Sequence, residues 1–166
     1  TNNIDLLIKA RWIIPIVPAN RVLEHCAIAI DKGQIIALVP NEEADRRFIA
    51  KETLNLGNQV LIPGLVNAHG HAAMSLLRGY ADDQPLHSWL NDHIWPAESR
   101  WVSEDFVRDG TELALAEMIK SGTTCFADMY FYPEQAAQTC LDARIRCQLA
   151  FPIFDFPTAW GMGPDD

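Results

Sequence analysis

Two histidines separated by one glycine are the residues of this sequence best suited to catalytic chemistry. His69, Gly70 and His71 follow an apolar run, and a helix-like stretch begins directly after them. If residues 60–68 form a strand that runs on into the pair, side chains two positions apart point to the same side, so both imidazoles can converge on one metal ion. Imidazole nitrogens bind zinc, and catalytic zinc sites keep one position open for water. The spacing predicts one divalent ion, zinc first and iron or manganese as alternatives, although the same spacing also occurs by chance in loops.

The composition excludes several kinds of partner. The sequence has 166 residues, with 13 Lys and Arg against 22 Asp and Glu, and a formal net charge of −9. A nucleic-acid backbone needs a concentrated basic face, so we expect no nucleic-acid partner. No apolar stretch reaches the roughly 18 residues that span a bilayer, and the N-terminus lacks a signal-peptide pattern, so we expect no membrane partner.

The cysteines favour a reducing compartment. They lack Cys-X-X-Cys spacing and lie in apolar surroundings, which is typical of buried free thiols rather than of disulfides or a zinc knuckle. We therefore expect a cytoplasmic protein. The four cysteines are Cys26, Cys125, Cys140 and Cys147.

The first part of the chain predicts a β-meander with one short helix. Asp31, Lys32 and Gly33 predict a hairpin turn, because Gly33 accepts the positive φ that such turns need. Asn41 is the candidate N-cap of the helix. The expected strands are residues 4–14, 23–30, 34–39 and 53–56, and the expected helix is residues 42–48.

The second part predicts alternating strands and helices. Ser103 is the candidate N-cap of a long helix, and Gly122 is placed where a left-handed C-cap residue ends it. An insert at residues 82–100 carries several aromatic and histidine side chains. The order strand, helix, strand, helix, strand is typical of a parallel α/β unit. The expected strands are residues 60–68, 123–129 and 145–151, and the other expected helices are residues 73–79 and 134–143.

The run from Pro63 to His71, which reads PGLVNAHGH, resembles the sequence that opens the barrel in the amidohydrolase superfamily. The residues after it resemble, more specifically, the 5-methylthioadenosine/S-adenosylhomocysteine deaminase branch. The resemblance covers nearly the whole chain. The matching positions are Met74, Leu76, Leu77, Arg78, Gly79, Asp82, Asp83, Leu86, Trp89, Leu90, Trp95, Pro96 and Glu98.

This resemblance implies an α/β fold in two parts. Residues 60–166 would be the first βα units of a (β/α)8 TIM-type barrel, and residues 1–59 the N-terminal strands of a small β-sandwich. Because such a barrel typically takes about 250 residues, we expect this chain to be the N-terminal portion of a longer protein. The sandwich would then have an unpaired edge. Related enzymes form dimers or larger assemblies, so a homo-oligomer is also possible.

The resemblance further implies a metal-dependent deaminase that converts an adenine nucleoside to its inosine form plus ammonia. The substrate would be 5′-methylthioadenosine or S-adenosylhomocysteine. An ion on His69 and His71 would lower the pKa of water towards about 7, which supplies hydroxide to attack the ring carbon that bears the amino group. Related deaminases use a Glu at the position of Glu98 to accept hydrogen bonds from both ribose hydroxyls, and a carboxylate offers two acceptor oxygens. Trp89 would contact the nucleoside.

The other polar and aromatic candidates receive supporting roles. Asp128 ends a strand, where it could orient a ligand histidine or make a structural hydrogen bond. We assign Trp95 to packing and Arg78 to anchoring the first helix. His87 and His93 receive surface or supporting roles, because neither ends a strand.

Two alternatives stay open. One is an aminohydrolase or chlorohydrolase that acts on guanine, cytosine or a triazine, with the same metal pair but a different ring at the insert. The other is a non-catalytic fragment or binding module, because the resemblance places the remaining His ligands, an acid/base Glu and an Asp on later strands. No catalytic residue beyond the metal ligands is therefore named within this stretch, and we expect the 166 residues alone to be inactive.

Overall fold

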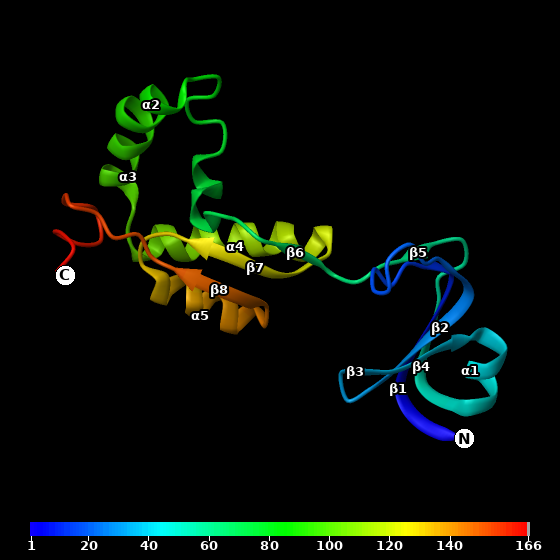
Figure 1. Cartoon of the computed structure of the whole chain (residues 1–166). Helices are drawn as coiled ribbons and strands as arrows, with labels where there is room; N and C mark the ends of the chain where they lie inside the picture. Colours follow the sequence, from blue (N-terminus) through cyan, green and yellow to red (C-terminus); the bar gives the residue numbers. More distant parts are fainter. Residues whose placement is uncertain (166) are drawn as a thin grey trace. The chain divides into compact units, whose positions relative to one another are not determined.

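The computed structural model describes residues 1–165, which divide into two compact units, Thr1–Pro63 and residues 64–165. In the first unit a mixed sheet has the strand order β3-β2-β1-β4, and a further short strand, β5, pairs with β1 (Figure 1). β1 is antiparallel to β2 and parallel to β4 and β5. The elements are β1 (Asn2–Ile13), β2 (Leu23–Asp31), β3 (Gln34–Pro40), α1 (Asn41–Arg47), β4 (Phe48–Asn55) and β5 (Val60–Leu61).

The core of the first unit is apolar, and its hairpin turn follows the prediction. Ile4 and Leu7 of β1 pack with Phe48 and with small buried residues of β2 and α1. The turn between β2 and β3 has positive φ at Lys32 (49°) and Gly33 (74°), the combination that matches the right-handed twist of paired strands. The predicted hairpin is thereby confirmed.

Two local predictions for this unit are wrong. Asn41 does not cap α1: Pro40, with extended backbone, is the N-cap residue, and Asn41 is already the first helical residue. The Asn41 Oδ1 atom is buried without a hydrogen-bond partner. Strand β4 begins at Phe48 rather than near residue 53, because the Phe48 side chain is buried in the core cluster.

The second unit contains a parallel sheet of strand order β6-β7-β8. Helix α4 packs against β7 and helix α5 against β8, and both helices contribute to the cluster around Phe126, so they cover one face of the sheet (Figure 1). The elements are β6 (Leu65–Asn67), η1 (Ala72–Leu77), α2 (Leu86–Ser88), η2 (Trp89–Ile94), α3 (Trp95–Trp101), α4 (Glu104–Ser121), β7 (Thr123–Met129), α5 (Pro133–Ala143) and β8 (Arg146–Ala150). The predicted order of strands and helices is confirmed.

The single strand predicted at residues 60–68 is wrong. Residues 60–61 form β5, which pairs with β1 in the first unit, and residues 65–67 form β6, which pairs with β7 in the second. Pro63 has no N–H to donate to a ladder, and residues 62–64 are outside both strands. The chain therefore passes from one sheet to the other at this proline.

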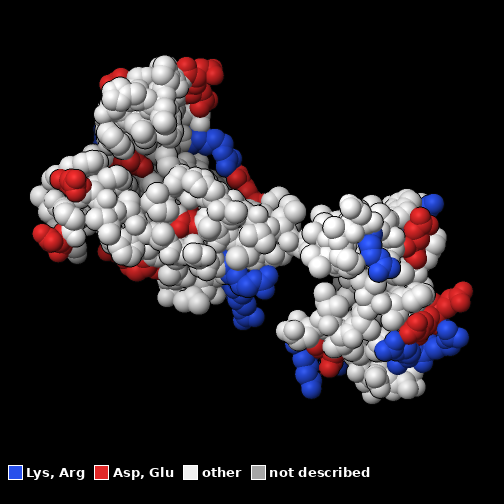
Figure 2. Space-filling model, in the orientation of Figure 1, with Lys and Arg blue, Asp and Glu red and all other residues white. Residues whose placement is uncertain are grey.

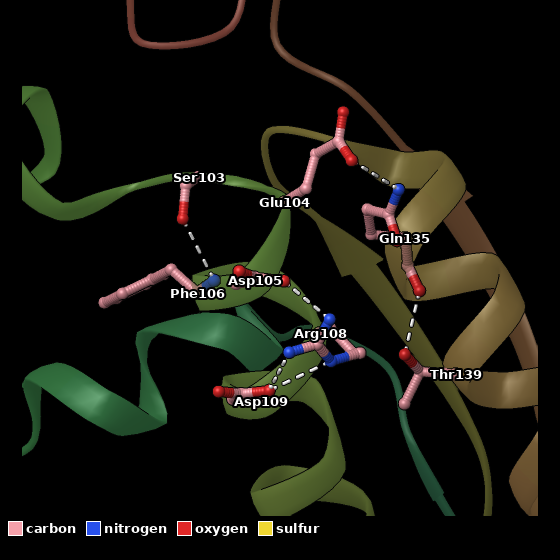
Figure 3. Close-up of polar contacts among 8 residues, drawn as sticks. All are labelled: Ser103, Glu104, Asp105, Phe106, Arg108, Asp109, Gln135 and Thr139. Carbon is pink, nitrogen blue, oxygen red and sulfur yellow. Dashed lines mark hydrogen bonds and ion pairs between the residues drawn. The ribbon is translucent and has the colours of Figure 1, made fainter.

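Both ends of α4 are capped as predicted. The Ser103 Oγ accepts the Phe106 backbone N–H at 3.2 Å, and Gly122 ends the helix in the left-handed conformation at φ 89°. Figure 3 shows this cap, with the Glu104 carboxylate accepting a hydrogen bond from the Gln135 side-chain amide of α5 at 3.3 Å. The N-terminal turn of α4 is thus tied to its neighbouring helix.

The stretch after His71 packs directly on α4. It is a 3-10 helix, η1, rather than the start of an α-helix. A Cβ atom added to Gly110 of α4 would lie 2.4 Å from the Ala73 carbonyl oxygen, so only glycine allows this close approach. Arg78, which follows η1, donates two hydrogen bonds to the Glu117 carboxylate of α4, at 2.9 and 2.6 Å. The predicted anchoring role of Arg78 is confirmed.

The insert forms a nearly continuous helix from α2 through η2 to α3, and its middle part, η2, is a π-helix. Pro96 accounts for this irregularity, because proline lacks the N–H of an α-helical bond and its ring clashes with the carbonyl four residues earlier.

Charged residues are dispersed on the face of the molecule that Figure 2 draws, where small groups of Asp, Glu, Lys and Arg are separated by other residues. Within residues 1–165, no helix is long and apolar enough to span a membrane.

Candidate active site

The loop that carries the two histidines is tied to the carboxyl end of β7. The His71 Nδ1 atom lies 2.7 Å from the Met129 carbonyl oxygen. The Ala72 backbone N–H donates to Asp128 Oδ1 at 2.7 Å, and the Met129 N–H donates to the Gly70 carbonyl at 3.2 Å. Three consecutive residues of the loop are therefore fixed to two consecutive residues of the neighbouring strand.

The two histidines converge, but not for the reason that the sequence suggests. Both lie beyond the end of β6 at Asn67, so the alternation of side chains along a strand does not apply to them. Instead the loop leaves the strand where Asn67 Oδ1 accepts the His69 backbone N–H at 3.2 Å. The two rings lie edge to face with centroids 5.1 Å apart. The loop, rather than the strand, brings them together.

The tautomer of His71 suits a metal ligand. A carbonyl oxygen can only accept a hydrogen bond, so the contact with Met129 requires the proton on Nδ1. In the neutral ring the lone pair is then on Nε2, and such a backbone contact is the usual partner of a metal-bound histidine. The donors therefore fit a divalent ion in chemistry. Among residues 1–165, however, no group of three or more His, Cys, Asp or Glu side chains is placed to hold one.

Asp128 holds the backbone directly after His71. The residue is 5% exposed, and its carboxylate accepts a hydrogen bond from the Ala72 N–H. Burial raises the pKa of Asp128, while the hydrogen bond from Ala72 and the nearby His71 oppose the rise. Of the two roles left open by the sequence, the structure therefore shows the structural hydrogen bond, and Asp128 reaches the His71 ring only through electrostatics.

Glu98 is a buried carboxylate on α3 that points to the end of β7. It is 8% exposed, and its Oε1 atom accepts a hydrogen bond from the Tyr130 hydroxyl at 2.8 Å. Burial raises the pKa of Glu98, while the bond from Tyr130 and the nearby His71 lower it. The insert and the histidine loop thus meet at the carboxyl end of β7.

Sequence reasoning missed Tyr130. Burial and the adjacent Glu98 carboxylate raise its pKa far above the ordinary value, so its hydroxyl stays protonated and donates. The available signal was its position, one residue after the strand that ends in Asp128 and Met129. Parallel strands present their carboxyl ends at the same edge of a sheet, and such edges carry sites.

The tryptophans and the other histidines of the insert lie as follows. A small cavity beside Glu98 is lined by Trp95 and several other aromatic residues, and the Trp95 ring packs 5.8 Å from Phe156. Trp89, the first residue of η2, is half-buried and does not line this cavity. His87 is exposed, with Nδ1 3.3 Å from the Asn91 side-chain nitrogen, and His93 is half-buried.

Comparison with known proteins identifies the class. The model of the amidohydrolase family matches residues 60–165, and the chain belongs to this family. Curated relatives are named 5-methylthioadenosine/S-adenosylhomocysteine deaminase. The one from Saccharophagus degradans is 60% identical over 98% of this chain and 36% of its own length, and the one from Teredinibacter turnerae is 52% identical over 100% and 38%. The resemblance seen in the sequence is confirmed, and the chain spans just over a third of these relatives.

Solved structures agree with the family. An adenosine deaminase from Xanthomonas campestris, described with bound zinc, is 44% identical with a TM-score of 0.93, over 99% of this chain and 37% of that one. Guanine deaminase from E. coli is 19% identical with a TM-score of 0.77, over 92% of this chain and 38% of that one. The second likeness shows the fold alone. Together they support a mixed α/β part of the amidohydrolase fold.

Proposed function

We propose that the protein containing this chain is a metal-dependent deaminase of adenine nucleosides, which acts on 5′-methylthioadenosine or S-adenosylhomocysteine. The observation that carries the proposal is the meeting of two chemically different groups at one strand end. The histidine loop and the buried Glu98 carboxylate are each hydrogen-bonded to the residues that end β7 or follow it. The names of the relatives at 60% and 52% identity support the same activity.

His69 and His71 are the proposed ligands of one divalent ion. The Met129 carbonyl fixes the His71 ring and leaves the Nε2 lone pair free for the ion. When bound, such an ion supplies the acidity that makes water nucleophilic at neutral pH. Zinc is the first choice, because a similar adenosine deaminase is described with bound zinc, although iron and manganese also accept imidazole.

Glu98 is the proposed ribose ligand. Tyr130 occupies one acceptor position on Oε1, and a carboxylate offers about four lone-pair positions on its two oxygens, so acceptor positions are left for a vicinal diol. Trp89 is proposed to contact the nucleoside from the insert. Both assignments extend the family resemblance to residues of this chain.

The larger architecture is part of the proposal. Strands β6, β7 and β8 would be the first three of a (β/α)8 barrel at residues 60–166, with residues 1–59 contributing to a β-sandwich. The parallel order of these strands and the position of the histidines beyond β6 support this arrangement. The remaining metal ligands and the general acid/base would lie on later strands. A cytoplasmic location, favoured by four free cysteines, and a homo-oligomeric state complete the proposal.

The test is ammonia release from the longest natural form of the protein, loaded with zinc. The substrates are 5′-methylthioadenosine, S-adenosylhomocysteine, adenosine, guanine and a chlorotriazine. Turnover confined to the adenine nucleosides supports the metal pair and the ribose role of Glu98. Turnover of guanine or the triazine alone keeps His69 and His71 but removes Glu98 as a sugar ligand. Silence on all of them refutes the proposed activity.

A further inference from the structure

Tyr130 is held rigidly by both neighbouring strands. It follows β7 directly, and its backbone N–H donates to the carbonyl of Ala150, the last residue of β8, at 3.3 Å. The centroids of its ring and the Phe131 ring are 5.1 Å apart, and the residue is 6% exposed. The position of its hydroxyl is therefore set by the parallel sheet rather than by the insert.

The carboxylate that this hydroxyl contacts needs such support. Glu98 lies on α3, at the end of an insert whose helix is interrupted by a π-helical segment. Within residues 1–165, Tyr130 is the side chain that hydrogen-bonds the Glu98 carboxylate. A glutamate side chain has several rotatable bonds, and ordering it only when a ligand arrives would weaken binding. A fixed donor on one oxygen removes most of that freedom in advance.

We propose that Tyr130 is a positioning residue for substrate specificity, whose hydroxyl holds the Glu98 carboxylate in the orientation that receives a vicinal diol. The inference rests on the proposed function and adds the residue that sets its preference for ribose. Tyr130 acts through Glu98 and forms no bond to the nucleoside. Burial of both partners keeps water from replacing the contact.

The test compares two nucleosides that differ only in the diol. The longest natural form of the protein, loaded with zinc, is assayed with adenosine and with 2′,3′-dideoxyadenosine as wild type and as Tyr130→Phe. The variant keeps the ring and removes the donor. For adenosine, kcat/KM is expected to fall about tenfold or more, mainly through KM, because a hydrogen bond to a charged group is lost. For dideoxyadenosine the change is expected to stay within about twofold, since no diol binds the carboxylate.

Two further variants separate positioning from general damage. In a Glu98→Ala background, Tyr130→Phe is expected to add no further loss with adenosine, because the residue through which it acts is gone. Tyr132→Phe is the matched control. Its hydroxyl donates to the Ala159 carbonyl at 2.6 Å, so the change also removes one hydrogen bond, and it is expected to affect both nucleosides equally.

The outcomes distinguish failure of the proposed function from failure of the positioning role of Tyr130. If the wild type deaminates neither of these nucleosides nor 5′-methylthioadenosine or S-adenosylhomocysteine, the proposed function and this inference fail together. If it deaminates only the 5′-thio nucleosides, the same comparison is made with 5′-methylthioadenosine and its 2′,3′-dideoxy derivative. If the wild type is active and Tyr130→Phe lowers kcat/KM equally for both nucleosides, only the inference fails. Should Tyr130→Phe not fold, Tyr130→Phe with Glu98→Leu replaces it, since removing both partners leaves no unpaired carboxylate. A further loss with adenosine relative to Glu98→Leu alone would then overturn the inference.

Discussion

The two units of the chain differ in what they bury. The interior of the first unit is made of apolar side chains such as Ile4, Leu7 and Phe48. Within residues 1–165, all the buried polar or charged residues lie in the second unit, and two of them are carboxylates, Glu98 and Asp128. Burying a carboxylate costs free energy even when it is hydrogen-bonded, as the raised pKa of each shows. The second unit therefore holds groups that stability alone does not select.

The contrast concerns the buried carboxylates alone, because both units have ion pairs that are accessible to solvent. The first unit keeps its ionic contacts accessible to solvent, as in the pairs of Lys9 with Asp45 and of Lys51 with Asp5. The buried carboxylates of the second unit instead bond to neutral donors, the Ala72 N–H and the Tyr130 hydroxyl. A neutral donor stabilises the carboxylate without neutralising its negative charge. The second unit therefore contains, besides its apolar clusters, buried carboxylates that the described part of the first unit lacks.

The largest expected effect is on chemistry and is confined to the second unit. Replacing His71 by Ala is expected to lower adenosine deamination on the order of a thousandfold or more, because the metal would lose a ligand. Zinc content per chain, measured by elemental analysis, should fall with activity while the circular dichroism spectrum is kept. His87→Ala, in the exposed part of the insert, is the control and should keep both zinc and activity. Full activity without bound zinc would contradict the metal assignment.

The next effect is on stability and is confined to the first unit. Leu7 is 3% exposed in the core of this unit. Replacing it by Ala is expected to cost about 2–5 kcal/mol of unfolding free energy, because apolar contacts are lost and a cavity remains. Denaturant unfolding measures the loss, and zinc bound per folded molecule should not change. If the variant lost bound zinc as well as stability, metal binding would depend on the core of the first unit, which would contradict the separate roles assigned to the two units.

The structure of the site was only partly predictable from its sequence. Caps such as Ser103 and Gly122 depend on local backbone chemistry, and they were predicted correctly. The histidine pair was predicted for the wrong local structure, since the strand ends at Asn67 and hydrogen bonds to β7 shape the loop. Tyr130 was missed because its role depends on a partner, Glu98, that is 32 positions away in the sequence. Long-range contacts of this kind leave no periodic pattern in a single sequence.

A smaller effect tests how the histidine loop is supported. In an exposed helix, Gly→Ala normally stabilises by about 1 kcal/mol. At Gly110 the opposite is expected, a loss of about 1–3 kcal/mol, because the added Cβ would overlap the Ala73 backbone and push η1 away from α4. Thermal unfolding measures the loss, and weaker zinc binding should accompany it, since η1 begins at the residue after His71. Glu112→Ala, on the exposed side of the same helix, is the control. A stabilised Gly110→Ala protein would contradict the close packing.

The smallest effects are expected where the two units are alike, at their exposed ion pairs. Arg78 lowers the pKa of Glu117 in the second unit, and Lys51 lowers that of Asp5 in the first. A carboxylate whose pKa is lower in the folded state stabilises above its ordinary pKa, and this contribution is lost as the pH falls through the lowered value. Glu117→Gln and Asp5→Asn should therefore each lower the unfolding midpoint slightly near neutral pH. Both differences should shrink as the pH is lowered towards about 3 and as salt is added, because exposed pairs are screened. If only Glu117→Gln lowered the unfolding midpoint, the two units would also differ at their surfaces. The difference between the units could then no longer be attributed to the residues that each unit buries.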